Sequence, residues 1–381
     1  MKIGLFTLEI GRQVGGLEVY ETNLIRALAR VDARNEYRVF CTDPRVPEIL
    51  DLQANNFSFE VLPRNRVRSV LWDAPRALAK ARLDLFHALF VPPPFTSVPY
   101  VFTHHGSEVM ERPDFYPLLL GARIRFLYRR AFARAALILC VSDYVRNYLI
   151  DHQRISTARV QTIYPGCRQE FLTVDKSAAR DFVKRKYGLN KPYLLIVGRI
   201  EPRKNPIRVL EAYDRFRRSV MNPPQLAFAG MKTWSAAEFD RTISKLGLQG
   251  WVVELGFVPD VDLPSLYSAA EFAVYASLWE GFGFPLLEAF STGTPLLTSR
   301  TTSLPEVSGG ACLLVDPHSV EEIAQGMVSL YSNQSLRADM IQKGFARVTA
   351  FSWDRTALQT SKAYEVVAAG FKAGQLFQSK L

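Results

Sequence analysis

Two carboxylates flank a glycine-rich turn in the stretch SLWEGFGFPLLEAFSTGTP, which covers residues 277–295. Glu280 lies before the Gly-Phe-Gly-Phe turn, and Glu288 lies after it. Pro285 near a first helical position and Gly293 just past a last one predict a helix over PLLEAFSTG. We therefore expect one carboxylate in the turn and the other in the first turn of the helix.

The predicted helix begins without a capping side chain. Phe284, expected at the N-cap, has no side-chain oxygen to accept the first free N–H groups, so those donors remain for a ligand. Gly281 and Gly283 let a ligand approach the backbone closely, and the helix dipole favours an anion there. With Phe282 between them, these residues form a candidate ligand-binding loop.

A second set of charged residues follows a predicted strand. The stretch YLLIVGRIEPRKNPIRVLEAY, residues 193–213, reads as a strand ending at Gly198 and Arg199, a turn with Arg203 and Lys204, and a helix. Arg199 and Lys204 therefore follow the C-terminal end of a strand, where such sheets bind ligands. Placed across a diphosphate, they would neutralise its charge and stabilise it as a leaving group.

The two sets of residues together indicate a ligand with a charged part and a neutral part. Glu280 alone would repel a phosphate at the helix N-terminus. The conflict disappears if Glu280 accepts hydrogen bonds from neutral hydroxyls while Arg199, Lys204 and the free N–H groups hold the charge. A nucleotide sugar has both parts.

Predicted strands alternate with helices twice along the chain, which indicates an α/β fold with parallel sheets. The strands of the first half are KIGLFTLE, EYRVFCTD, LDLFHALF, PYVFTHH and ALILCVS, and those of the second are YLLIVGR, LAFAG, VVELGFV, FAVYASL, TPLLTS and ACLLVD. We expect two doubly wound halves of similar size that meet near residue 185, with ligands in the cleft between them.

Length and composition are those of a globular protein with two domains. The chain has 381 residues, of which 48% are apolar. No secretory signal is recognisable at the N-terminus, and no run approaches the ~18 to 20 apolar residues of a membrane span, so we expect a soluble cytoplasmic protein. The four cysteines lack C-x-x-C pairing, which argues against a zinc site and against a disulfide framework.

The net charge of +10 is concentrated in the first half, where residues 1–180 hold 25 Lys and Arg against 18 Asp and Glu. Much of the excess lies in residues 63–69 and 121–136. In the second segment, Arg123, Arg130 and Arg134 can share one helical face, while the apolar surface comes from Ile124, Phe126, Leu127, Phe132 and Ala133. This face is either simply solvated or in contact with anionic lipid headgroups or a polyanionic acceptor, at the inner face of a membrane.

These motifs closely resemble the retaining glycosyltransferases of family four, which have the GT-B fold. The strongest part runs over residues 193–318 and includes the family's Glu-x7-Glu signature, as Glu280 and Glu288. The resemblance implies that Glu280 contacts the hydroxyls of the donor sugar and that Glu288 contacts the nucleotide ribose. It likewise implies that Arg199 and Lys204 bind the donor diphosphate.

The resemblance also implies a domain organisation. We expect an acceptor-binding Rossmann-like domain over residues 1–175 and a domain that binds the nucleotide sugar over 186–355. FSWDRTALQTSKAYEVV, residues 351–367, resembles the family's final segment, whose helix crosses back to the N-terminal domain. Residues 356–381 are accordingly expected to pack on that domain.

The N-terminal half matches the family more loosely. GRQVGGLEVYETNLIRAL resembles a glycine-rich loop that faces the diphosphate and the acceptor, which points to Gly15 and Gly16. YVFTHHGSEVMERP resembles a strand followed by a His-Asp pair near the sugar, but here His105 is followed by Gly106. Either His105 or its neighbour His104 is a candidate catalytic residue, or both support the end of the strand. The other histidines, His87, His152 and His318, are expected to be structural.

Two other interpretations of single motifs are weaker. Asp260 and Asp262 have the spacing of a metal-binding Asp-x-Asp, but they precede LPSLYSAA, so we expect Asp262 to cap that helix and no metal to bind. Asp43 could contact a ribose in a nicotinamide-dependent dehydrogenase. The first loop lacks the G-x-G-x-x-G spacing of such enzymes, and Arg199, Lys204, Glu280 and Glu288 would have no role.

Three classes of function remain open from the sequence. A transferase explains both charged sets, whereas a GT-B-type sugar nucleotide epimerase or hydrolase needs a further acid/base pair. A basic membrane-surface protein explains only the charge, and nucleic acid is disfavoured because no basic stripe interleaved with exposed aromatics stands out. We predict a metal-independent, retaining hexosyltransferase that uses a nucleotide sugar, with GDP-mannose favoured, and a saccharide or lipid-linked acceptor in cell-surface polysaccharide or glycolipid synthesis.

Overall fold

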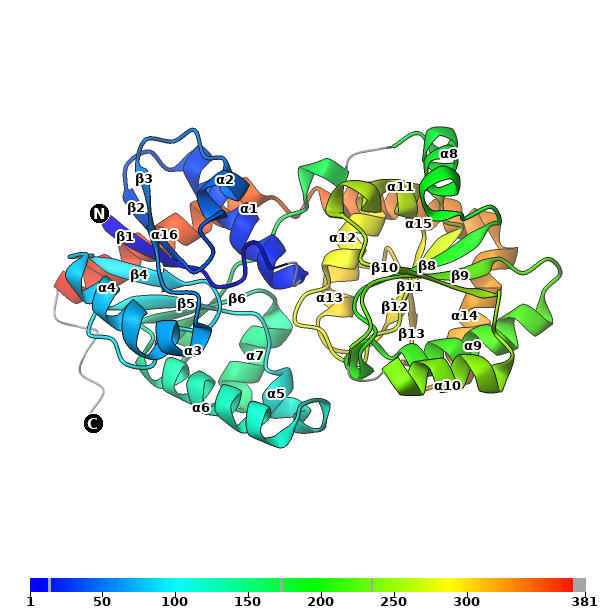
Figure 1. The fold of residues 1–381 in the computed structure, drawn as a ribbon, viewed down its shortest axis with the longest axis horizontal. Helices are drawn as coiled ribbons and strands as arrows, with labels where there is room; N and C mark the ends of the chain where they lie inside the picture. Colours follow the sequence, from blue (N-terminus) through cyan, green and yellow to red (C-terminus); the bar gives the residue numbers. More distant parts are fainter. Residues whose placement is uncertain (13–14, 172–173, 234–235, 373–381) are drawn as a thin grey trace. The chain divides into compact units, whose positions relative to one another are not determined.

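The computed structural model describes residues 1–12, 15–171, 174–233 and 236–372, which form two compact units (Figure 1). The first unit combines Met1–Gly166 with the segment that begins at Ser352, and the second is Cys167–Phe351. The sequence placed 356–381 with the first unit and began the second at 186. The structure begins the second unit at Cys167, so it includes residues 167–175, which were expected in the first domain, and 176–185, which had been assigned to neither. Helix α8 (Lys176–Tyr187) packs there against α11 (Leu263–Ala269).

The first unit is built on a parallel sheet of seven strands in the order β3-β2-β1-β4-β5-β6-β7. The strands are β1 (Lys2–Phe6), β2 (Glu36–Cys41), β3 (Phe57–Val61), β4 (Leu85–Ala88), β5 (Tyr100–His104), β6 (Leu137–Cys140) and β7 (Val160–Thr162). Strands β4, β5 and β6 are buried along their whole length, as expected for parallel strands covered on both faces.

Helices cover both faces of this sheet (Figure 1). They are α1 (Gly16–Val31), α2 (Val46–Leu50), α3 (Arg66–Arg68), α4 (Ala74–Lys80), α5 (Glu108–Glu111), α6 (Leu118–Arg134), α7 (Asp143–Asp151) and the C-terminal α16 (Trp353–Lys372). Helix α16 packs against α1, so the end of the chain completes the layer begun near its start.

A buried chain of hydrogen bonds joins α16 to the sheet. The Tyr364 hydroxyl contacts Nδ1 of His87 at 2.7 Å, and Nε2 of the same ring contacts Oγ1 of Thr103 at 2.7 Å. Thr103 in turn contacts the Tyr20 hydroxyl at 3.1 Å. Burial lowers the pKa of His87 to about 3, so the ring is neutral and can donate at one nitrogen and accept at the other.

The second unit repeats the doubly wound arrangement with six parallel strands in the order β10-β9-β8-β11-β12-β13. The strands are β8 (Tyr193–Val197), β9 (Gln225–Ala229), β10 (Val252–Gly256), β11 (Phe272–Tyr275), β12 (Leu296–Ser299) and β13 (Leu313–Val315). Besides α8 and α11, the helices are α9 (Pro206–Ser219), α10 (Ala236–Leu246), α12 (Phe284–Ser291), α13 (Leu304–Ser308), α14 (Val320–Ser332) and α15 (Gln334–Val348).

Strand order reverses once in each sheet, between β1 and β4 and between β8 and β11. At such a switch point the loops after two neighbouring strands leave toward opposite faces, which opens a crevice at the carboxyl ends. In the second unit, the loop after β8 carries Arg199 and Lys204, and the loop after β11 carries Glu280. The topology therefore brings together two segments about eighty residues apart in sequence.

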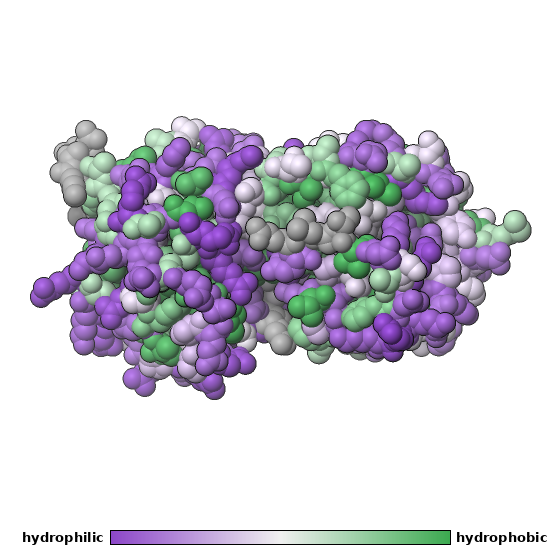
Figure 2. Space-filling model, turned by 90° about the horizontal axis from the view of Figure 1, so that it is seen from above, coloured by the Kyte–Doolittle hydropathy of each residue, from purple (hydrophilic) through white to green (hydrophobic). Residues whose placement is uncertain are grey.

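One face of the molecule is largely polar (Figure 2). Figure 2 shows a face on which hydrophilic side chains predominate and hydrophobic ones form small groups. Of the helices in the described ranges, none combines the length and the apolar character that crossing a bilayer requires.

The hydrogen-bond chain under α16 predicts a stability effect. Tyr364→Phe removes the partner of His87 Nδ1 and leaves a buried ring nitrogen unpaired, so the free energy of unfolding should fall by roughly 1–3 kcal/mol in denaturant titrations. The matched control is Tyr331→Phe, because the Tyr331 hydroxyl bonds the Asn222 carbonyl at an exposed position. Equal stability of the two variants would contradict a structural role for the buried chain.

Candidate active site

The loop after β8 packs closely against the backbone that follows β9, and one asparagine ties it to the end of β11. A Cβ atom on Gly230 would lie 1.9 Å from the Gly198 carbonyl oxygen, so a side chain at position 230 is excluded. Asn205 adopts a left-handed conformation, with φ 61°, and its buried amide donates to the carbonyls of Ala276 and Pro317 at 3.1 and 2.7 Å. These contacts fix the turn that carries Arg203 and Lys204.

A buried ion cluster lies where these two loops meet. Lys204 Nζ donates to Oε1 of Glu280 at 2.7 Å and to the Tyr275 hydroxyl at 2.5 Å. Arg203 donates to Oε2 of Glu280 at 2.8 Å and, through its other terminal nitrogen, to Glu201 at 2.8 Å. Glu280 and Glu201 are both buried, so each carboxylate is compensated by a hydrogen-bonded cation.

The cluster keeps Glu280 ionised. Burial acts to raise the pKa of Glu280, but Arg203 and Lys204 outweigh it and lower this pKa to about 2. Burial lowers the pKa of Lys204, whereas Glu280 acts to raise it. Glu280 is thus a permanent acceptor at neutral pH, suited to hydroxyl donors.

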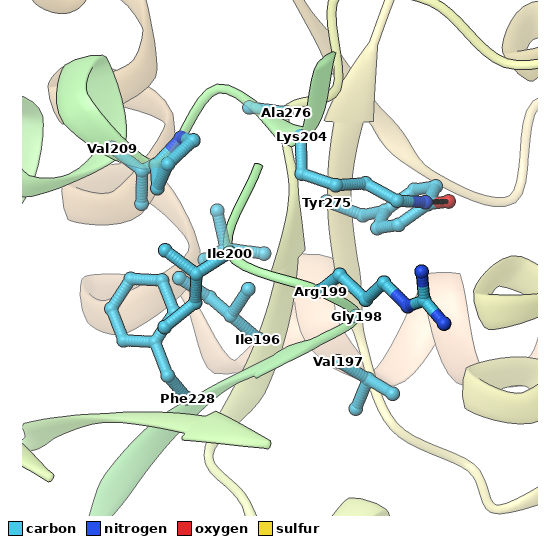
Figure 3. Close-up of a pocket in the computed structure, with 12 residues that line it drawn as sticks. Ile196, Val197, Gly198, Arg199, Ile200, Lys204, Val209, Phe228, Tyr275 and Ala276 are labelled. Carbon is cyan, nitrogen blue, oxygen red and sulfur yellow. Dashed lines mark hydrogen bonds between the residues drawn. The ribbon is translucent and has the colours of Figure 1, made fainter. Parts of the chain in front are cut away.

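Arg199 and Lys204 both line a small cavity at the end of β8, together with Gly198 and Tyr275 (Figure 3). In this view Lys204 lies along the Tyr275 ring, and Arg199 extends from the start of the same loop. Arg199 is exposed, and its side chain bonds to no other residue of the described ranges. Its guanidinium can therefore take an anion without breaking an existing ion pair.

The sequence analysis assigned Lys204 to one end of a ligand and Glu280 to the other. The structure brings them into direct contact, so they form one unit that presents a carboxylate and an ammonium side by side. It adds Arg203, which the sequence analysis placed in the same turn without a role. The sequence feature that could have indicated a role for Arg203 is its position next to Lys204 in a tight turn (Pro202–Lys204).

The start of α12 differs from the expectation in one residue. Gly283, with φ 110°, is the N-cap, and Phe284 is the first helical residue. A Cβ atom on Gly283 would lie 2.8 Å from Leu304, and a side chain would be strained in this left-handed conformation, so glycine is required here. The expectation of a helix without a side-chain cap is confirmed, but at Gly283 rather than Phe284.

The glycine-rich turn before α12 is held by the segment after β12. The Ser303 hydroxyl contacts the carbonyls of Glu280 and Phe282, each at 3.0 Å. The Glu280 N–H donates to Oγ1 of Thr302 at 3.2 Å. Gly281 lies between the two carbonyls that Ser303 binds, so the backbone of the whole predicted ligand loop is fixed.

Glu288 is buried in the second turn of α12, one turn later than expected. Oε1 accepts a hydrogen bond from Arg168 at 2.6 Å, and Oε2 accepts one from the Tyr267 hydroxyl at 2.9 Å. Arg168 also pairs with Asp260 at 2.6 Å. The sequence analysis missed Arg168, which is 120 positions from Glu288 and belongs to no motif recognised in the sequence.

Asp262 lies at the N-cap position of α11, as expected, but the capping hydrogen bond expected of its side chain is not made. Its side chain makes no cap at α11 and instead accepts hydrogen bonds from Lys186 at 2.6 Å and Tyr187 at 2.5 Å, which fixes α8 to α11. Asp260 is paired with Arg168. Within the described ranges, no group of three or more His, Cys, Asp or Glu side chains is arranged to hold a metal ion.

The candidate residues of the N-terminal half lie in the first unit. Gly15, with φ 81°, is the N-cap of α1, and Gly16 is its first residue; residues 13–14 of the same loop lie outside the described ranges. Nε2 of His105 contacts the Leu89 carbonyl at 2.7 Å, and burial lowers the pKa of this histidine to about 4. His105 is therefore neutral at pH 7, with Nε2 as the donor.

The other histidines have local partners. His104 is fully buried, and its Nε2 contacts the Ser107 hydroxyl at 2.8 Å. His87 belongs to the chain under α16, and the His152 ring packs on Tyr148 with 4.9 Å between the ring centroids. Of the two neighbouring histidines at the end of β5, His104 is buried and His105 is partly accessible.

Comparison with known proteins identifies the family. Residues 14–171 match the family described as Glycosyltransferase Family 4, and residues 179–347 match Glycosyl transferases group 1. O-antigen chain mannosyltransferase B from Escherichia coli is 31% identical over 388 residues, which cover 96% of this chain and 100% of the relative. The chain belongs to glycosyltransferase family 4.

Solved structures show that this glycosyltransferase has the GT-B fold. HepE from Anabaena, solved in complex with UDP and glucose, has a TM-score of 0.77 at 17% identity, with 96% of this chain and 100% of that one covered. WaaG, a glycosyltransferase involved in lipopolysaccharide biosynthesis, has a TM-score of 0.72 at 19% identity, with 96% and 99% covered. The predicted fold class is confirmed.

The ion cluster predicts how activity of the glycosyltransferase depends on pH. Arg203→Gln removes one of the two cations that lower the pKa of Glu280, so burial should raise that pKa and protonate the carboxylate at higher pH. Turnover of the variant should therefore be lost at a higher pH than turnover of the parent as the solution is acidified. The measurement is kcat/KM from pH 4 to 8 with the nucleotide sugar that gives turnover in a panel.

A second arginine provides the control for this pH profile. Arg215 on α9 makes an exposed ion pair with Glu321 at 2.7 Å, and Arg215→Gln should leave the profile unchanged. A folded Arg203→Gln enzyme that loses turnover at the same acidic pH as the unsubstituted enzyme would contradict this prediction. It would show that the pKa of Glu280 does not depend on Arg203.

Proposed function

We propose that this glycosyltransferase moves a hexose, mannose or a similar sugar, from a nucleotide donor to a hydroxyl of a saccharide or lipid-linked acceptor, with retention at the anomeric carbon. The observation that carries this proposal is the pairing of a permanently ionised Glu280 with Lys204, beside the unpaired Arg199. A sugar and a diphosphate need such a pair of sites next to each other. The relative that makes O-antigen chains supports mannose and a role in cell-surface polysaccharide or glycolipid synthesis.

The roles of the individual groups follow from their chemistry. Glu280 accepts hydrogen bonds from the sugar hydroxyls, and Arg199 and Lys204 hold the diphosphate. Lys204 has three N–H donors, of which Glu280 and Tyr275 take two, so one remains for a phosphate oxygen. Gly281, Phe282, Gly283 and Phe284 form the loop that the donor approaches. Within the first unit, Gly15 and Gly16 remain candidate donor-binding residues and His105 a candidate catalytic residue.

The proposed reaction breaks the bond between the anomeric carbon and the diphosphate oxygen and forms one to the acceptor oxygen on the same face. The leaving diphosphate accepts the proton of the acceptor hydroxyl, so no further base is needed. Lys204 and Arg199 stabilise the charge that grows on the leaving group. We propose that these two cations neutralise the negative charge of the leaving group without the help of a metal ion. The assays below therefore contain EDTA.

An epimerase or hydrolase remains the alternative use of the same site. It would release nucleotide without an acceptor, whereas a transferase releases nucleotide only as fast as an acceptor is consumed. Release of nucleoside diphosphate is therefore measured with and without saccharide acceptors.

Two variants test the assignment of the ends of the donor. Glu280→Gln keeps the size of the side chain but weakens charge-assisted hydrogen bonds of ~1.5 to 3 kcal/mol, so transfer should slow roughly ten- to a hundredfold while nucleoside diphosphate still binds. Lys204→Ala should lower turnover and also weaken binding of the free diphosphate. Affinity is measured by calorimetry and turnover by product release.

The control for both is Lys245→Ala, which removes an exposed lysine from α10. Circular dichroism establishes that each variant is folded, because both changes disturb a buried ion cluster. If Glu280→Gln abolished diphosphate binding while a folded Lys204→Ala retained binding and turnover, the two assignments would be wrong.

We further propose that α6 rests on an anionic membrane surface. Its first residues Leu118 and Leu119 are 80% and 86% exposed, and Phe126 is 58% exposed. Arg123 and Arg134 are exposed beside them, whereas Arg130 is bound to the Pro94 carbonyl at 2.6 Å and Phe132 is buried, which corrects the predicted face. A helix with apolar and basic exposed residues is suited to the lipid headgroup region.

Exchange of the exposed residues tests this contact. Arg123→Gln with Arg134→Gln should weaken binding to anionic vesicles roughly thirtyfold, at ~1 kcal/mol per basic residue near the surface, and Leu118→Gln with Leu119→Gln should weaken it further. The control pair, Lys184→Gln with Arg185→Gln on α8, removes the same charge elsewhere. Binding is measured by sedimentation of the protein with the vesicles. If both charge variants sedimented equally less than the unsubstituted protein, the contact through α6 would be contradicted and the effect would be one of net charge.

A further inference from the structure

Arg168 occupies an unusual place for a charged residue. It is the second residue of the second unit, in the segment that connects the units, and only 8% of its side chain is exposed. Its guanidinium lies over the Phe171 ring, 4.3 Å from the centroid. One terminal nitrogen pairs with Asp260 and the other with Glu288, each at 2.6 Å.

The connecting segment is also fixed to α12 by the preceding residue. Cys167 Sγ lies 2.9 Å from the Ser291 hydroxyl, one helical turn after Glu288. The Arg168 side chain therefore reaches Glu288 from an anchored backbone. A planar guanidinium held between two carboxylates and an aromatic ring has little freedom to rotate, so it fixes the plane of the Glu288 carboxylate.

The carboxylate that Arg168 holds still has unused acceptor positions. A carboxylate offers about four such positions, two on each oxygen. Arg168 uses one on Oε1, and the Tyr267 hydroxyl uses one on Oε2. One position on each oxygen remains, and a pair of neighbouring hydroxyls is the donor group that matches two adjacent acceptors.

We infer that Arg168 is the positioning residue that orients Glu288 to accept both hydroxyls of the nucleotide ribose. The inference rests on the proposed function, and within it on the contact with the nucleotide ribose that the family resemblance implies for Glu288. A buried Nε–H of Arg168 has no partner within the described ranges. An unpaired buried donor is unfavourable, so the arrangement is better explained by the orientation of Glu288 than by stability alone.

The test compares nucleotides with and without the two hydroxyls. Calorimetry gives the affinities of the full-length protein for GDP and UDP and for their 2′,3′-dideoxy analogues, in the parent and in Arg168→Gln and Arg168→Lys. The parent should bind the tighter of the two ribonucleotides at least tenfold more strongly than its dideoxy analogue. Arg168→Gln should reduce this ratio of affinities to about one or two. Arg168→Lys keeps the charge without the planar guanidinium, so its ratio should lie between those of Arg168→Gln and the unsubstituted protein.

Two further variants separate positioning from folding. Arg217→Gln removes a part-buried arginine of the same unit that pairs with Asp214 at 2.6 Å and lies over Trp251, and it should keep the ratio of the parent. Asp260→Asn weakens only the outer partner of Arg168, so it should lower the ratio two- to threefold in a stable protein. If Arg168→Gln does not fold, the affinity ratio of Asp260→Asn alone tests the positioning role of Arg168.

The outcomes distinguish the inference from the function on which it rests. One outcome is that the unsubstituted protein prefers the ribonucleotide to its dideoxy analogue while the folded Arg168 and Asp260 variants show the same preference. That result would overturn the inference and leave the ribose assignment intact. A parent with equal affinity for both forms would overturn the assignment of Glu288 to the ribose, and the inference with it.

Discussion

The buried ion cluster of Glu280, Arg203 and Lys204 is the constraint on which the candidate site depends. A carboxylate in this position would be protonated or displaced without its two cations, because burial disfavours its charged form. Both cations come from one turn after β8, whereas Glu280 follows β11. The site therefore exists only if these strands are neighbours and the turn is held firmly, which the switch point and Asn205 achieve.

The two signature glutamates are supported in the same way but from different parts of the chain. Each carboxylate accepts from an arginine and has a tyrosine hydroxyl beside it: Tyr275 contacts both Lys204 and Glu280, and Tyr267 bonds Glu288. Arg203 is supplied locally, by the loop that also carries the diphosphate candidates. Arg168 is supplied by the connecting segment. The motif is thus only half of the site, since its charge state and orientation are set by residues outside it.

The sequence was sufficient for the architecture and for the residues that lie within motifs. It did not predict β3 or β7, because the Phe57–Val61 edge strand is only partly buried and β7 has three residues, so neither has a clear apolar pattern. It misplaced the cap of α12 by one residue, because the left-handed conformation of Gly283 depends on packing against Leu304. Asp262 was expected to cap a helix rather than to bind α8, and Arg168 had no expected role, because their partners on α8 and α12 are distant in sequence and are set by tertiary packing.

Helix α16 has a consequence for the order in which the protein can be made. The second unit is a continuous segment, so it can fold as soon as it has left the ribosome. The first unit lacks the partner of α1, and its His87 ring lacks the Tyr364 hydroxyl, until the last helix has been synthesised. During translation, the segment Met1–Gly166 is therefore made before the second unit but is completed after it, when α16 packs against α1.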